Sequence, residues 1–308
     1  MDSGVDSARR SASHGAAIGF ALFVTFLWST SWIVIRWGLD DEGLPPLTFA
    51  ALRYSLAAVV LLGWIASQSD YRESLRRLDR SALTGIVGLG MIMYAITQGA
   101  QFVAIDSQPA ATSSLVLSGT PLVVAFLGAR ALKERPTFRQ LVGAVLVITG
   151  AAVYFSGSLS ATAVGLVAAF VGLVANSFGA VLGRGVNRSA SVPVVVVTGL
   201  SMAVGAATLL LVAGLIDGLP AVSARAWVMI AWLAVVNTAL AFTLWNLSLR
   251  RLTALESAAI NNTMLLQIGL LAWWLLDEYP GPLGFAGIGL ASIGILLAQT
   301  SRSQLHRG

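Results

Sequence analysis

Ten apolar stretches follow one another along this chain, each close to the roughly 20 residues that a helix needs to cross a bilayer. Of its 308 residues 56% are hydrophobic and only 11% are charged, whereas soluble domains carry about 25% charged residues. Lipid must therefore be the main solvent of this chain. We expect an all-α integral membrane protein with ten transmembrane helices, at 17–38, 46–67, 82–104, 109–131, 138–155, 162–183, 194–216, 225–247, 254–276 and 281–300.

The prolines agree with these boundaries, because all but one lie in a loop or at a proposed helix end. Pro121 falls inside the fourth stretch, where a proline removes a backbone hydrogen bond and kinks a helix. We therefore expect Pro121 to act as a hinge. The first stretch is too long for the core of a signal peptide, so we interpret it as an uncleaved helix.

An internal repeat is indicated by a pattern near the end of each half of the chain. Leu132, Glu134 and Pro136 form an L-x-E-x-P motif, which Gly143 and Gly150 follow in a seven-residue step. The same residue types return 144 positions later, at Leu276, Glu278, Pro280, Gly287 and Gly294. The expected organisation is an N-terminal tail, two five-helix repeats and a C-terminal tail, at 1–16, 17–155, 162–300 and 301–308.

Basic residues predict how the two repeats are inserted. If the N-terminus is cytoplasmic, 16 of the 19 Lys and Arg lie on the cytoplasmic side, and the exceptions are Arg36, Arg53 and Arg225. The positive-inside rule then places both termini in the cytoplasm. Five helices per repeat is an odd number, so the second repeat is inverted. Inverted repeats in a membrane chain are typical of alternating-access transporters.

Several functional classes find no support in the residues. The chain has no cysteine, and its two histidines, His14 and His306, lie in the polar tails. A disulfide, a thiolate nucleophile or a histidine metal site is therefore not expected. No phosphate-binding loop or nucleophile motif occurs either. We expect no catalytic residue, no cofactor, no metal and no nucleic-acid partner. We interpret the excess of basic residues as charge that sets the orientation of the helices in the membrane.

Polar side chains inside apolar helices are expensive, which makes each of them a candidate for a transport pathway. Trp28, Trp32 and Arg36 recur every four residues and share one face of the first helix. They would suit an aromatic substrate with a carboxylate; the alternative is tryptophan facing lipid beside a snorkelling arginine. Arg53 would also bind a carboxylate near the outer side; the alternatives are snorkelling or pairing with the acidic first loop.

The third helix carries Met91, Tyr94, Gln98 and Gln101 at helical spacing, which predicts a cavity face or, alternatively, hydrogen bonding between helices. Amides can bind both the ammonium and the carboxylate of a zwitterion without a fixed charge. Structural hydrogen bonding is the alternative for each amide alone, but together they favour a shared polar cavity. The further candidates on the sixth, eighth and ninth helices are Asn176, Asn237, Phe242, Trp245, Asn246, Asn261 and Asn262.

The ten spans, their two halves and the repeated L-x-E-x-P motif resemble the EamA-type drug/metabolite transporter superfamily, over roughly residues 16–300. The likeness is greatest to bacterial YddG-type aromatic amino-acid exporters. The resemblance implies that helices one to four and six to nine surround a central cavity, while helices five and ten lie outside it. It also implies export of small metabolites across the bacterial inner membrane, and glycine-rich outer helices would permit a homodimer.

The position of the acidic residues bears on the mechanism. Every Asp and Glu lies in a tail, in a loop or near the end of a helix, whereas proton-coupled transporters usually carry a carboxylate in mid-membrane. We therefore expect a uniporter or exchanger without a buried proton relay. Its expected substrates are neutral and aromatic amino acids; the alternative is efflux of organic cations such as viologens, which aromatic walls also suit.

Overall fold

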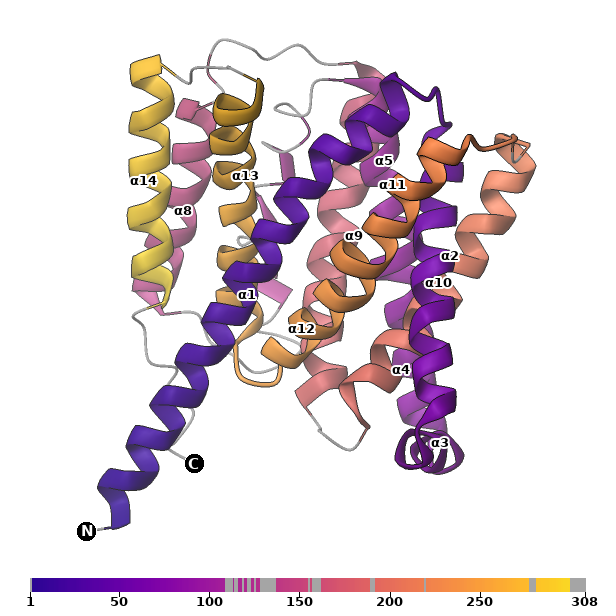
Figure 1. The fold of residues 1–308 in the computed structure, drawn as a ribbon. Coiled ribbons are helices and arrows are strands. Elements are labelled where there is room, and N and C mark those ends of the chain that lie inside the picture. Colours follow the sequence, from indigo (N-terminus) through magenta and orange to yellow (C-terminus); the bar gives the residue numbers. More distant parts are fainter. Residues whose placement is uncertain are drawn as a thin grey trace.

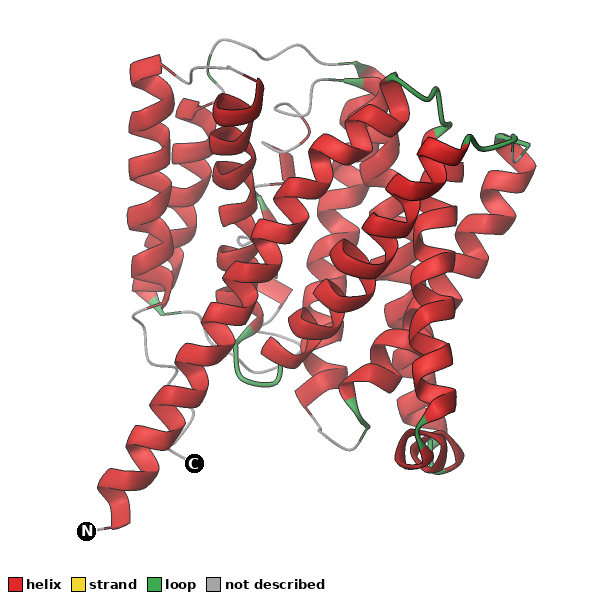
Figure 2. Ribbon diagram, viewed as in Figure 1, coloured by secondary structure: helices red, strands yellow, loops and turns green. Residues whose placement is uncertain are grey.

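The computed structural model describes residues 2–108, 113, 116–117, 119–120, 123–124, 126–127, 137–154, 156, 162–188, 192–218, 220–276 and 281–299. All regular secondary structure in this part of the chain is helical (Figures 1 and 2). The elements are α1 Asp2–Asp40, α2 Pro46–Ser67, α3 Ser69–Arg76, α4 Arg80–Leu89, η1 Gly90–Ile96, α5 Thr97–Ser107, α8 Phe138–Tyr154, α9 Ala163–Arg188, α10 Val194–Ile216, α11 Ala224–Ala234, η2 Val235–Leu240, α12 Ala241–Ser248, α13 Ala254–Leu276 and α14 Gly281–Gln299.

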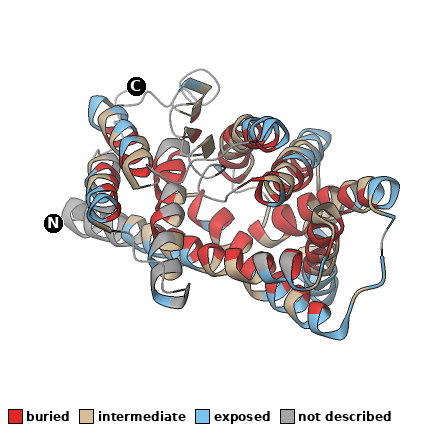
Figure 3. Cartoon of the chain, turned by 90° about the horizontal axis from the view of Figure 1, so that it is seen from above, coloured by how far each residue is buried: buried red, intermediate tan, exposed pale blue. Residues whose placement is uncertain are grey.

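Within the described residues, six helices are long and apolar enough to cross a membrane. They are His14–Leu39, Pro46–Ser67, Arg80–Ser107, Ala163–Arg188, Val194–Ile216 and Ala224–Ser248. The outward faces of the bundle are apolar as well: Val59 and Val228 expose 65% and 71% of their surface. Figure 3 shows the buried residues turned toward the centre of the bundle. Such a surface requires lipid, and the chain is a multi-pass membrane protein.

Helix boundaries differ from the expected ones mainly at charged or polar ends. α1 begins at Asp2, well before the expected start at 17, because extending an existing helix through a proline-free tail adds one backbone hydrogen bond per residue. α9 continues to Arg188 rather than ending at 183. The exposed helix α3 was not expected, because its eight residues are too polar to register as a membrane span. The fourth expected helix, with Pro121, lies largely outside the described residues.

Two π-helical segments interrupt the third and eighth helices of the expected scheme. η1 lies between α4 and α5, and η2 lies between α11 and α12. A shift of 144 residues, the offset of the L-x-E-x-P motif, moves η1 onto residues 234–240, which almost coincide with η2. Single π turns inside α-helices are frequent at functional sites. The backbone interruption therefore recurs at equivalent positions in the two halves of the sequence.

α8 and α14 lie side by side at one edge of the molecule, remote from α2 and α10 at the other edge (Figure 1). Glycine makes their close contact possible. A Cβ atom on Gly287 would lie 2.5 Å from the Gly150 carbonyl oxygen, and one on Gly294 would lie 2.5 Å from the Gly143 oxygen. The seven-residue glycine steps of the two halves therefore pack against each other, as small residues commonly do between transmembrane helices.

Candidate functional site

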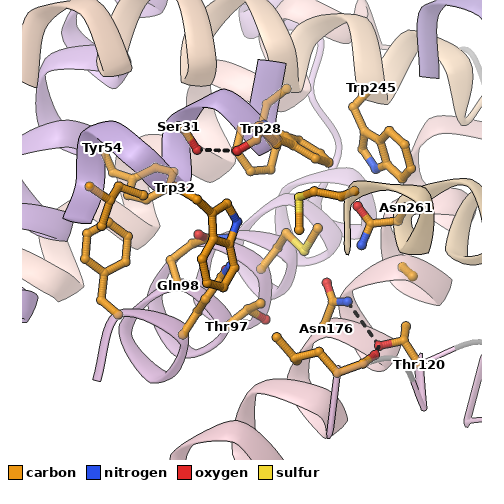
Figure 4. A pocket seen from close by; sticks show the side chains of 18 of the residues that line it. Trp28, Ser31, Trp32, Tyr54, Thr97, Gln98, Thr120, Asn176, Trp245 and Asn261 are labelled. Carbon is orange, nitrogen blue, oxygen red and sulfur yellow. Dashed lines mark hydrogen bonds between the residues drawn. The ribbon is translucent and has the colours of Figure 1, made fainter. Parts of the chain in front are cut away.

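A cavity lies between α1, α2, η1, α5, α9, α12 and α13. Its empty volume is about 990 Å³, a figure that includes open solvent at its mouth, and the space open to the centres of water-sized molecules is about 90 Å³. Nine of the residues proposed from the sequence line it: Trp28, Trp32, Arg53, Gln98, Gln101, Asn176, Phe242, Trp245 and Asn261. Residues more than 200 positions apart in the sequence thus meet at one site, as Figure 4 shows for Trp28 and Trp245.

One side of the cavity is aromatic. The ring of Trp28 on α1 lies 4.8 Å from that of Phe242 and 5.2 Å from that of Trp245, both on α12. Tyr54 on α2 and Tyr94 on η1 approach Phe242 at 6.1 and 4.9 Å. These tilted and edge-on arrangements are the ones that aromatic pairs prefer. Trp28, Tyr54, Phe242 and Trp245 form an apolar wall of the cavity that would accommodate a planar or aliphatic group of a ligand.

Amide side chains line the cavity on other helices. Gln98 and Gln101 extend from α5, Asn176 from α9 and Asn261 from α13, several of which are labelled in Figure 4. The Asn176 side-chain nitrogen lies 3.4 Å from the Thr120 hydroxyl, its partner in the structure. The amide side chains carry no net charge and offer both donors and acceptors. They can therefore bind polar groups of either sign.

Arg53 brings a positive charge to the cavity from α2. Its side chain is only 3% exposed, and its Nε donates to the Thr238 hydroxyl at 2.7 Å. Its Nη2 lies 3.3 Å from the backbone oxygen of Asn237, and its guanidinium carbon lies 5.4 Å from the Tyr54 ring centre. Among the described residues that line the cavity, Arg53 is the single charged side chain. The site is therefore positively charged and mainly apolar.

The Asn237 carbonyl links the aromatic wall to Arg53. Besides Arg53, it accepts a hydrogen bond of 3.1 Å from Nε1 of Trp28. In an α-helix it would pair with the Ala241 N–H, but that group donates to the Thr238 oxygen instead. The π turn η2 thus frees this carbonyl from its usual partner and orients it toward side chains from α1 and α2.

Three residues proposed from the sequence lie behind the cavity wall. Tyr94 is buried against Phe242, Asn237 donates to the Leu27 oxygen and to Thr30, and Asn246 donates to Thr198. A direct contact of these side chains with a ligand in the cavity is therefore not supported. The side chains of Arg36 and Asn262, and the proposed hinge Pro121, lie outside the described residues.

Of the four residues in the expected stripe on the third helix, only the two that follow η1 line the cavity; Met91 and Tyr94, which lie inside η1, do not. Gln98 and Gln101 line the cavity, but Met91 is 37% exposed and contacts the Thr208 hydroxyl through its sulfur. A π turn contains more residues than an α turn, so positions before and after it do not keep the α-helical register. Uninterrupted 3.6-residue spacing therefore predicted one continuous face where the helix has two.

Several residues that line the cavity were not predicted from the sequence, although some of them carry a weak signal there. Thr97 and Thr120 are hydroxyl residues within apolar stretches, and Tyr54 directly follows the intramembrane Arg53. Ser31 is a hydroxyl residue of the same kind, whereas Met93 and Met264 carry no such signal, because apolar residues are ordinary in transmembrane helices.

Two acidic residues at helix ends, Glu256 and Asp217, have partners outside the cavity. Glu256 is buried, which its position near a helix end did not indicate, and its carboxylate accepts from the backbone N–H and hydroxyl of Thr253 as in a capping box. His14 lies 3.8 Å from it. Asp217 accepts from Thr48 at the start of α2. Within the described residues, no group of three His, Cys, Asp or Glu side chains is placed to hold a metal ion.

A helical bundle with apolar outward faces and an internal cavity is the architecture expected of a multi-pass membrane transporter. The sequence profile of the EamA-like transporter family matches residues 15–156 and again residues 163–300. The chain therefore belongs to the EamA-like transporter family, within the drug/metabolite transporter superfamily.

Curated relatives carry transporter names. A probable terminal-alkyne amino-acid exporter of Streptantibioticus cattleyicolor is 27% identical over 90% of this chain and 92% of its own. A probable amino-acid metabolite efflux pump of Escherichia coli is 30% identical over 46% of this chain and 43% of its own. An S-adenosylmethionine/S-adenosylhomocysteine transporter of Chlamydia trachomatis is 32% identical over 45% of this chain and 42% of its own. The last two matches thus span less than half of either chain.

A solved crystal structure is similar in fold. It shares 21% sequence identity, and the comparison covers 95% of this chain and all of that chain with a TM-score of 0.77. At this identity the similarity establishes a common fold and carries no information on the ligand.

Proposed function

We propose that this protein exports small metabolites, above all neutral and aromatic amino acids, across the bacterial inner membrane by alternating access. The observation that carries the proposal is the cavity in which Trp28, Phe242 and Trp245 oppose amides from α5, α9 and α13. The aromatic wall would hold the substrate side chain, and the amides would hold its polar groups. The amino-acid exporters named among the relatives are consistent with this substrate class.

The substrate carboxylate would contact Arg53, and Arg36 is proposed as a second contact nearer the outer side. The topology that belongs to this proposal has ten spans in two inverted halves with both termini cytoplasmic. The packing of α8 against α14 through glycine would leave their outer faces free for a homodimer.

Transport would proceed as uniport or exchange. No acidic side chain is among the described residues lining the cavity, and Glu256 is engaged in capping α13. A proton relay of the usual kind needs a carboxylate in the pathway. Proteoliposomes with an imposed pH gradient test this point, and uphill accumulation of the substrate would contradict it.

Trp245→Ala tests the aromatic wall in an uptake screen of amino acids in proteoliposomes. Removing the indole takes away its contact with Trp28, so we expect the apparent affinity for phenylalanine and tryptophan to fall about tenfold, with a smaller loss for alanine. Trp274→Ala is the matched control, because Trp274 is 77% exposed on the outside of the bundle. Equal effects of both substitutions would show that Trp245 does not contact the substrate.

Export of organic cations is the second candidate, and the same liposomes discriminate it. Aromatic rings attract cations, but the single described charge in the cavity is that of Arg53. Accumulation of viologens with no amino-acid transport would favour this second function.

A further inference from the structure

The cavity has an unbalanced charge. Its described lining comprises apolar, hydroxyl, thioether and amide side chains together with the single cation Arg53. An amino-acid zwitterion would bring one negative and one positive group to this lining. The carboxylate would find a fixed countercharge, whereas the ammonium group would find only dipoles and aromatic faces. A ligand that carries the carboxylate alone matches the charge of the cavity more closely.

Among the described residues, the acidic groups at the ends of neighbouring elements have partners other than Arg53 and do not neutralise its charge. Asp217, at the end of α10, accepts hydrogen bonds from Thr48. Asp41 and Glu42, after α1, lie 3.8 and 3.4 Å from Arg225. No ion pair joins Arg53 to any described residue. Its hydrogen bonds go to a hydroxyl and to a backbone carbonyl, both of which are neutral. A buried cation with neutral partners attracts an anion strongly.

Arg53 keeps hydrogen-bond donors for a ligand. Nε and one N–H group of Nη2 donate to Thr238 and to the Asn237 oxygen, while the second N–H group of Nη2 and both of Nη1 have no hydrogen-bond partner among the described residues. Because Arg53 lines the cavity, these N–H groups are the donors that it can offer to a ligand. The Asn237 carbonyl also accepts a hydrogen bond from Trp28, so it fixes the position of Arg53 relative to the aromatic wall.

We propose that the cavity binds and transports aromatic monocarboxylates that lack an ammonium group, such as arylalkanoates and N-acyl aromatic amino acids, at least as well as the parent amino acids. This inference rests on the proposed function, since it assigns the same cavity a wider substrate class. The carboxylate binds Arg53 and the ring lies against Trp28 and Phe242. Aromatic amines, which bring only a cation, are excluded by the same charge.

The test uses proteoliposomes loaded with phenylalanine and exchanging it for labelled external phenylalanine at neutral pH. The competitors are 3-phenylpropionate, N-acetylphenylalanine and 2-phenylethylamine. We expect both acids to halve the exchange at concentrations equal to or below the one needed with unlabelled phenylalanine. The amine should need a concentration about tenfold higher or should not inhibit. Labelled 3-phenylpropionate should itself be taken up. The inference is overturned if the acids do not compete while phenylalanine is exchanged.

Variants of Arg53 isolate the role of the charge. Arg53→Gln keeps donors near Thr238 but loses the charge, and Arg53→Lys keeps the charge. We expect the inhibition constant of the acids, divided by that of the amine, to rise about tenfold in Arg53→Gln and much less in Arg53→Lys. This ratio is independent of the amount of folded protein. Arg225→Gln, an exposed arginine outside the cavity, is the matched control and should leave the ratio unchanged.

Thermal stabilisation by each compound separates failure of this inference from failure of the proposed function. If no amino acid is transported but 3-phenylpropionate stabilises the wild type and not Arg53→Gln, the anion site stands and the amino-acid function falls. If phenylalanine is transported and the acid neither stabilises nor competes, the amino-acid function stands and the anion inference falls. An unchanged acid-to-amine ratio in Arg53→Gln also rejects the inference.

Discussion

The two π turns occupy equivalent places in the two halves of the chain but are held by different forces. At η1 the backbone is in close contact with α10: a Cβ atom on Gly90 would lie 2.4 Å from the Ser201 oxygen, and one on Gly205 would lie 2.4 Å from the Cβ of Tyr94. At η2 the Asn237 carbonyl instead accepts side-chain donors from Trp28 and Arg53. The first turn depends on backbone packing, and the second depends on side-chain hydrogen bonds.

The same difference extends to the cavity. Gln98 and Gln101 follow η1, and a shift of 144 residues places them on Phe242 and Trp245, which follow η2. All four line the cavity. The repeats therefore share a backbone interruption and differ in the side chains that follow it. Such asymmetry suits the proposed substrate, whose ring would contact the aromatic side chains and whose polar groups would contact the amides.

The largest expected effect comes from disturbing the packing of η1. Gly205→Ala places a methyl group against Tyr94 Cβ and 2.7 Å from the Gly90 oxygen, and neither of these atoms can move without the backbone. We expect the free energy of unfolding to fall by about 3 kcal/mol. Thermal unfolding of the purified protein in detergent measures the loss.

Gly63→Ala is the control for that substitution. Gly63 lies in α2, and a Cβ atom there would have no neighbour within 4 Å. Alanine is the better helix former, so the control should be neutral or slightly stabilising. Equal stability of the Gly205 and Gly63 variants would show that close packing does not hold η1.

The sequence predicted those parts of the fold that depend on local properties. α2 and α10 begin and end at the expected residues, because proline and apolar length determine a membrane helix locally. The π turns have no comparable signal, since η1 depends on contacts with α10, more than 100 residues away. Helical spacing therefore identified Gln98 and Gln101, which lie in regular helix, and misplaced Tyr94, which lies inside η1.

An intermediate effect is expected from removing one of the side-chain bonds near η2. Thr238→Val leaves the volume nearly unchanged but removes the acceptor of Arg53 Nε. We expect the free energy of unfolding to fall by about 1–2 kcal/mol, because a hydrogen bond to a charged group is lost while the bond to Asn237 remains. Thr238→Ser keeps the hydroxyl and should behave like the wild type. Similar losses in the serine and valine variants would assign the effect to packing.

The smallest effect is expected at Thr97, the first residue after η1. Its hydroxyl donates to the Ile92 oxygen at 2.8 Å, and its backbone N–H donates to the same oxygen. If glycine packing holds η1, Thr97→Val should reduce the free energy of unfolding by only about 0.6 kcal/mol, the usual contribution of a side-chain hydrogen bond within a membrane. Thr97→Ser is the matched control, and thermal unfolding is the suitable measurement because Thr97 also lines the cavity. A loss as large as that of Gly205→Ala would mean that a side-chain hydrogen bond holds η1 too, and the contrast between the two turns would disappear.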